Sequence, residues 1–104
     1  MNIRDLSVDE RTVQLIEECG ECIQAAAKLI RAMHGWSTPI KPIEAREHLI
    51  EEIADVSVCM TALGDMAPLS DVGEIITQKA ARWTERINDP ETRRKMMEGA
   101  YGEE

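Results

Sequence analysis

The chain has 104 residues, with 20 acidic and 12 basic side chains and a net charge of −8. Such an excess of acid argues against non-specific nucleic-acid binding, which depends on lysine and arginine neutralising phosphates. No apolar run approaches the roughly 20 residues of a membrane span, and the length predicts a single domain over 1–104 with mobile ends at 1–6 and 99–104.

The first predicted helix begins after Ser7. Ser7 and Glu10 have the spacing of a capping box, in which each side chain accepts a hydrogen bond from the other residue's free backbone N–H. Apolar residues then recur every three or four positions to about Met33, which is the helical period. Gly35 is expected to end this helix.

A second helix is expected to open near Ile43 or Glu44, and Gly64 and Pro68 are expected to close it. Its apolar stripe consists of Leu49, Ile53, Val56, Met60 and Leu63.

Two further helices complete the prediction. Asp71 and Glu74 resemble a second capping box and would start a third helix that runs through Ile87, with Trp83 on its apolar, core-facing stripe. Asp89 as N-cap and Pro90 at the first helical position predict a short fourth helix to about Glu98.

The fold class is therefore all-α, with a long antiparallel hairpin, a third helix and a short fourth one, in a four-helix-bundle arrangement. There is no phenylalanine, one tyrosine and two tryptophans, so leucine, isoleucine, valine, alanine and methionine must build the core. A chain of this size buries a thin core on its own. We therefore expect a homodimer or homotetramer whose assembly extends that core.

Two acidic pairs stand beside the apolar stripes of the hairpin. Glu18 and Glu21 are three residues apart, as are Glu52 and Asp55, so each pair shares one helix face. An antiparallel hairpin can bring the four carboxylates together, which would be costly without compensation. Mg²⁺ or Mn²⁺ bound by oxygen ligands would offset this cost. The alternative interpretation is that the acids form a solvated face.

The charge pattern along the chain points the same way. Between Arg46 and Lys79 there are seven acids and no base, and half of the twelve bases lie between Lys79 and Lys95. An acidic half followed by a basic helix suits divalent cations and an anionic substrate. Charge balancing between neighbouring helices is the alternative.

Three motifs in this order resemble the MazG-like all-α nucleoside triphosphate pyrophosphohydrolases. They are Glu17-Glu-Cys-Gly-Glu21, Glu51-Glu-Ile-Ala-Asp55 and Lys79-Ala-Ala-Arg82-Trp-Thr-Glu-Arg86. The resemblance spans most of the chain and keeps the helix order. It departs at Trp83, where that family commonly has asparagine.

The lack of a long apolar run or signal peptide and the odd number of cysteines predict a cytoplasmic protein. The resemblance implies a Mg²⁺-dependent enzyme that hydrolyses a nucleoside triphosphate to the monophosphate and pyrophosphate. It implies Glu18, Glu21, Glu52 and Asp55 as metal ligands, with Glu17 or Glu51 as an extra ligand or as the base for the attacking water. Lys79, Arg82 and Arg86 would hold the phosphates, and Trp36 could stack on the base or cap the core.

Several alternatives stay open. The substrate could be another phosphoanhydride such as phosphoribosyl-ATP, or the chain could be a non-catalytic helical interaction module. Three further polar residues could reach the site or be solvated. They are His48, one turn before Glu52, and Lys28 and Gln14 on the acidic face of the first helix. Cys19 and Cys22 form a CxxC pair inside a helix, which favours buried cysteines over zinc or redox chemistry.

Overall fold

The computed structural model describes the backbone of residues 1–101 and the side chains of residues 1–99. After a short 3₁₀ turn at Ile3–Asp5, α1 spans Val8–Met33, α2 spans Pro42–Ala62, α3 spans Leu69–Asn88 and α4 spans Pro90–Tyr101. The described part contains no strand, which confirms the all-α class. None of its helices is both long and apolar enough to cross a membrane.

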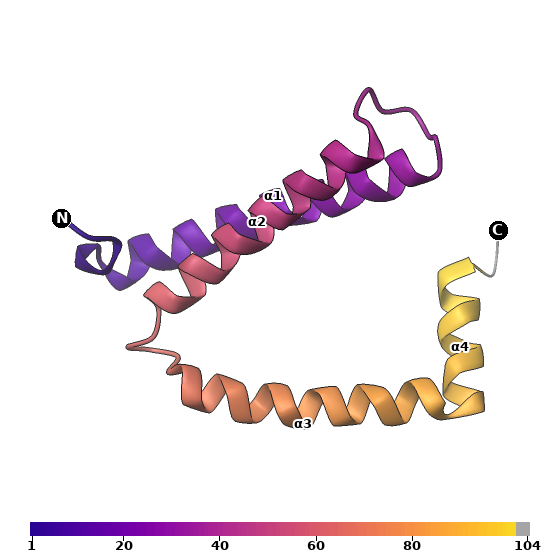
Figure 1. Ribbon diagram of the computed structural model, residues 1–104. Helices are drawn as coiled ribbons and strands as arrows, with labels where there is room; N and C mark the ends of the chain where they lie inside the picture. The colour runs from indigo at the N-terminus through magenta and orange to yellow at the C-terminus, as the bar shows by residue number, and fades with distance from the viewer. Residues whose placement is uncertain (102–104) are drawn as a thin grey trace. The chain divides into compact units, whose positions relative to one another are not determined.

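The chain divides into two compact units, Met1–Pro68 and the part from Leu69 onwards. The single domain and its mobile ends stay a prediction, and residues 102–104 of the predicted mobile end lie outside the described residues. The first unit is the hairpin of α1 and α2, which lie side by side and antiparallel (Figure 1).

Three helix ends lie where the sequence predicts them, whereas α4, predicted to end near Glu98, continues to Tyr101. Glu10 donates its backbone N–H to Ser7 Oγ at 3.1 Å, and Ser7 N–H donates to Glu10 Oε1 at 3.3 Å. Gly35 follows α1 with φ of 67°, a left-handed conformation that glycine adopts without a steric penalty. At α4, Thr92 N–H donates to Asp89 Oδ2 at 3.0 Å, which confirms the predicted N-cap.

The predicted starts of α2 and α3 are each displaced. α2 begins at Pro42 itself, because proline already has helical φ and its missing N–H would be unpaired in the first turn. α3 begins at Leu69, directly after Pro68, so Asp71 lies inside the first turn. There its carboxylate interacts favourably with the positive end of the helix dipole, but Asp71 is not the N-cap.

The two hairpin helices meet along positions spaced by seven residues, and we call this contact the seam. On α1 the seam positions are Arg11, Glu18, Ala25 and Ala32; on α2 they are Ala45, Glu52 and Cys59. In the described residues every buried side chain except Arg11 is an alanine or a cysteine. Close packing of small side chains therefore brings the two helices together.

The predicted apolar stripe of α2 is only partly at the seam. Leu49, Val56 and Leu63 are half-buried, whereas Ile53 and Met60 are 50% and 41% exposed. The seam of α2 runs through Ala45 and Cys59 instead. Apolar residues spaced alternately by three and four form a stripe too wide for one neighbouring helix to bury completely.

Arg11 ties the beginning of α1 to the end of α2. Arg11 is 6% exposed, and its guanidinium donates to Leu6 O at 3.1 Å, to Ala62 O at 2.6 Å and to both oxygens of Asp65 at 2.9 and 3.0 Å. Ala62 is the last residue of α2, so Arg11 satisfies a carbonyl that has no partner within its own helix. Asp65 neutralises this buried charge.

The second unit contains α3 and α4 (Figure 1). None of the residues of α3 is buried. Leu69, Ile76 and Trp83 are spaced by seven residues, as one apolar stripe requires, and are 59%, 57% and 62% exposed. The apolar stripe predicted to contain Trp83 is thus present. Among the described residues, however, the Trp83 side chain is not buried in a core.

The Arg11–Asp65 pair predicts a specific pH dependence of stability. Hydrogen bonds from Arg11 lower the pKa of Asp65 below its ordinary value. The pair therefore stabilises the fold above the ordinary aspartate pKa of about 3.9, and this stabilisation is lost as the pH falls through the lowered value. We expect Asp65→Asn to lower the melting temperature by several degrees at pH 7 and by progressively less below pH 4.

Melting curves from pH 3 to pH 8 test this expectation. The exposed Asp9→Asn change, at the same end of the hairpin but outside the hydrogen bonds of Arg11, serves as the matched control. A wild-type melting temperature equal to that of Asp65→Asn at pH 7 would show that the pair contributes nothing measurable.

Candidate metal centre

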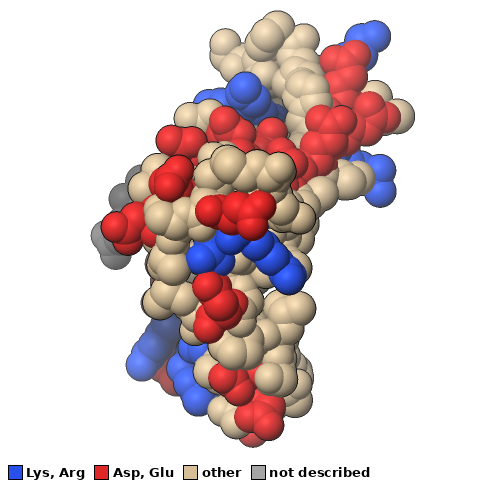
Figure 2. Space-filling view, turned by 90° about the vertical axis from the view of Figure 1, so that its left-hand side faces the viewer, with Lys and Arg blue, Asp and Glu red and all other residues tan. Residues whose placement is uncertain are grey.

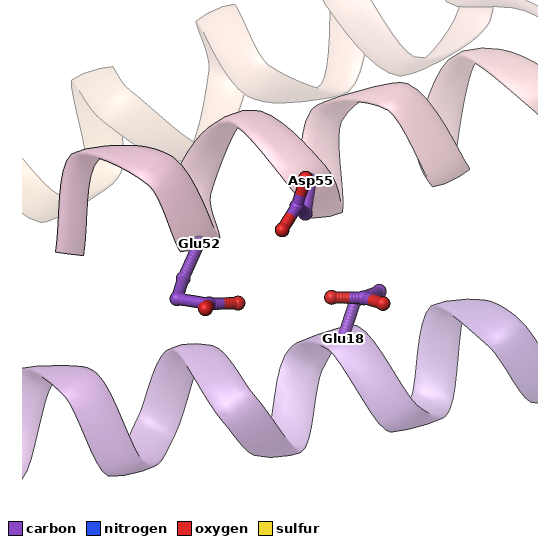
Figure 3. Close-up of side chains that lie close together, drawn as sticks. All are labelled: Glu18, Glu52 and Asp55. Atoms are coloured by element: carbon purple, nitrogen blue, oxygen red, sulfur yellow. The ribbon is translucent and has the colours of Figure 1, made fainter. Parts of the chain in front are cut away.

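Three carboxylates meet in the middle of the hairpin. Glu18 comes from α1, and Glu52 and Asp55 come from α2; one oxygen of each lies within 4.8 Å of the others. Figure 3 shows the three side chains in the space between the two helices. The structure therefore brings together three of the four carboxylates that the sequence analysis proposes as metal ligands.

Two of these carboxylates occupy seam positions that would ordinarily hold apolar side chains. Glu18 and Glu52 are half-buried, and the Oε2 atom of each is buried without a hydrogen-bond partner in the described part of the chain. A buried acceptor without a partner is unfavourable. A hard divalent cation is a natural partner for such oxygens, so the residues present fit Mg²⁺ or Mn²⁺.

The charge around Glu18 is unbalanced. Burial raises the pKa of Glu18 above its ordinary value, and the nearby carboxylates of Glu21 and Asp55 raise it further. Gln14 opposes this, because its Nε2 donates to Glu18 Oε1 at 2.8 Å. Burial, Glu18 and Asp55 likewise raise the pKa of the Cys59 thiol. The site thus holds negative charge that the protein itself does not neutralise.

The other predicted metal-site and catalytic residues are less closely grouped. Glu21 is exposed and lies outside the triad, although it affects the pKa of Glu18 and lines a cavity together with Glu52. Glu17 and Glu51 are exposed on α1 and α2. Their roles as extra ligand or base stay predictions.

The predicted substrate contacts fall outside the triad. Lys79, Arg82 and Arg86 are exposed on α3, which belongs to the second unit, so their contact with phosphates stays a prediction. Trp36 is 56% exposed in the connection after α1. Its ring stacks on His34 with centroids 4.6 Å apart, and its contact with a base or with the core edge stays a prediction.

A cavity of about 310 Å³ lies between α1 and α2 and shares Glu52 with the triad. Its lining consists of Glu21, Gln24, Ala25, Lys28, Ala45, His48 and Glu52. Sequence reasoning assigned no role to Ala25 and Ala45, although each is seven residues from a seam carboxylate. That spacing is the signal that could have found them.

The cysteines show no sign of a zinc or disulfide site. All three are free; Cys19 and Cys22 are half-buried and Cys59 is buried. Among the described residues, the group that could hold a metal ion contains no cysteine. Their role as small apolar residues stays a prediction.

Acidic side chains gather on part of the protein surface. In the face shown in Figure 2, red carboxylate side chains lie next to one another over the upper part of the view. An anionic ligand would approach this surface unfavourably unless a cation is bound there.

Comparison with known proteins gives no match to the chain, whether with protein-family models, with curated proteins or with solved structures. The geometry of the hairpin therefore carries the functional argument.

The triad predicts that stability depends on metal ions. Because the folded state raises the pKa of Glu18, its ionisation destabilises the metal-free fold as the pH rises through that pKa. In EDTA at pH 7 we expect Glu18→Gln to melt at a higher temperature than the wild type, with the difference vanishing below about pH 4. Mn²⁺ at a hundred times its Kd should stabilise the wild type by about 2.7 kcal/mol.

Thermal denaturation with EDTA, Mg²⁺ and Mn²⁺ measures both effects. Glu18→Gln should lose the response to metal, whereas Glu47→Gln, an exposed change on α2, should keep it. If metal leaves the wild-type melting temperature unchanged, the three carboxylates do not form a metal site.

Proposed function

We propose that this chain is a metal-dependent nucleotide pyrophosphohydrolase of the MazG-like type, which converts a nucleoside triphosphate to the monophosphate and pyrophosphate. One observation carries the proposal: Glu18 and Glu52 face each other at seam positions and each has a buried oxygen without a partner, next to Asp55. Carboxylates at these positions pack unfavourably, but they are well placed to bind a cation. The ordered acidic and basic motifs support the same reaction class.

In this proposal the hairpin holds Mg²⁺ through Glu18, Glu52 and Asp55, with Glu21 close by. When bound, the ion would lower the pKa of a coordinated water and neutralise phosphate oxygens. Gln14 fixes the orientation of the Glu18 carboxylate through its hydrogen bond. Glu17 and Glu51, each adjacent to a ligand in the sequence, are the candidates for accepting the proton of the attacking water.

The proposal includes a homodimer or homotetramer. The hairpin buries alanine and cysteine, whereas Ile16, Ile23 and Ile30 are 65%, 70% and 49% exposed. These three isoleucines are spaced by seven residues, and their stripe lies on a different side of α1 from Glu17 and Glu21. A stripe of this kind is typical of a helix that packs against another helix, and a second copy of the chain can supply one.

Pyrophosphate release from ribo- and deoxynucleoside triphosphates, with Mg²⁺, Mn²⁺ or EDTA, tests the activity. We expect metal-dependent release from one or a few substrates. Glu52→Gln and Asp55→Asn should lower kcat/KM more than roughly a hundredfold, because they remove ligands of the ion that stabilises the transition state. Circular dichroism should show unchanged helix content.

Glu47→Gln is the matched control and should retain wild-type activity. Wild-type rates in Glu52→Gln would contradict the site assignment. Release from phosphoribosyl-ATP but from no triphosphate would keep the chemistry and change the substrate. Neither turnover nor metal binding would favour the alternative, a helical interaction module.

Light scattering tests the assembly. The wild type should have a mass of two or four times the 11.7 kDa of one chain. Ile23→Glu places a charge in the exposed stripe and should shift the mass toward 11.7 kDa, while Gln24→Glu, which adds the same charge on the cavity side, should not. A wild-type mass of one chain at micromolar concentration would contradict the oligomer.

A further inference from the structure

The cavity beside the triad is lined by both acidic groups and hydrogen-bond donors. From Glu52 it extends toward the connection between the helices, past His48 on α2 and toward Lys28 on α1. His48 lies four residues, or about 6 Å along the helix, from Glu52. The cavity therefore places donors next to carboxylates that belong to the metal centre.

Lys28 contributes a positive charge that no acid takes up. The ion pairs within the described residues join Arg11 to Asp65 and Arg94 to Glu91 and Glu98, and none of them includes Lys28. Side chains on a helix lean toward its N-terminus. Lys28 lines the same cavity as Gln24 and Glu21, which lie four and seven residues before it on α1.

The cavity exists because its floor is made of alanines. Ala25 and Ala45 are 7% and 1% exposed, and their methyl groups leave the space above them open. The volume of about 310 Å³ is at the lower end of the range for small-ligand sites. No phenylalanine, tyrosine, tryptophan or large apolar side chain lines it, and its one ring is the imidazole of His48.

We propose that this cavity binds a phosphate group of the substrate, through Lys28 with Gln24 and His48, next to the ion held by the triad. The inference rests on the proposed function and deepens it, because it assigns phosphate recognition to the hairpin itself. An anion seated there would accept charge-assisted hydrogen bonds from Lys28 on one side and contact the metal on the other. The expected ligand class is an inorganic or nucleoside polyphosphate.

Calorimetry with Mn²⁺ and then with inorganic tripolyphosphate separates the two proposals. Tripolyphosphate has no sugar or base, so its affinity reports phosphate contacts alone. Lys28→Gln should bind Mn²⁺ like the wild type and bind tripolyphosphate roughly tenfold more weakly, the value of one charge-assisted hydrogen bond. Arg31→Gln removes the same charge from α1 outside the cavity and should bind both ligands like the wild type.

The outcomes are distinguishable. A wild type that does not bind Mn²⁺ contradicts the proposed function, and the phosphate site is rejected with it. If Mn²⁺ binds but tripolyphosphate does not, or if Lys28→Gln binds tripolyphosphate as tightly as the wild type, only the phosphate site is rejected. Equal weakening in Lys28→Gln and Arg31→Gln indicates general charge attraction and also rejects it. If Lys28→Gln weakens a nucleoside triphosphate alone, the cavity holds the nucleoside.

Discussion

The hairpin is built around a contact that is unfavourable by itself: two glutamates of like charge face each other at the centre of the seam. Like charges in a partly buried position disfavour folding unless something offsets them. Among the described residues, the offset near Glu18 is a single hydrogen bond from Gln14, a neutral side chain. The stability of the hairpin must come from elsewhere, namely the small seam residues and the Arg11 contacts at one end.

That arrangement links function to assembly. The polar side of the hairpin carries the carboxylates and the cavity, whereas Ile16, Ile23 and Ile30 lie along another side of α1 and remain exposed. A second copy that packs on the isoleucines would add the apolar burial that the alanine seam lacks and leave the polar side accessible to an ion and a nucleotide. Under the proposed function, such an oligomer would stabilise a fold whose centre binds ligands.

Features set by local chemistry were predictable from the sequence, whereas features set by contacts between distant residues were less so. The Ser7 and Asp89 caps, the helices and the meeting of Glu18 with Glu52 and Asp55 all follow from spacing along a helix and from antiparallel pairing. The Arg11 contacts did not follow, because Ala62 and Asp65 are more than 50 residues away and nothing local pairs them with an arginine. The cavity was missed for a related reason: alanines at Ala25 and Ala45 create space only once two helices are apposed.

The seven-residue spacing of the seam has a consequence for how the chain can tolerate insertions and deletions. Each residue added within a helix rotates everything beyond it by about 100°, as set by 3.6 residues per turn. One residue inserted between Arg11 and Glu18 would turn one of them away from α2. The connection between α1 and α2 carries no seam residue and can change length. Relatives of this chain should therefore vary in the connection and keep constant the number of residues between Arg11 and Ala32 and between Ala45 and Cys59.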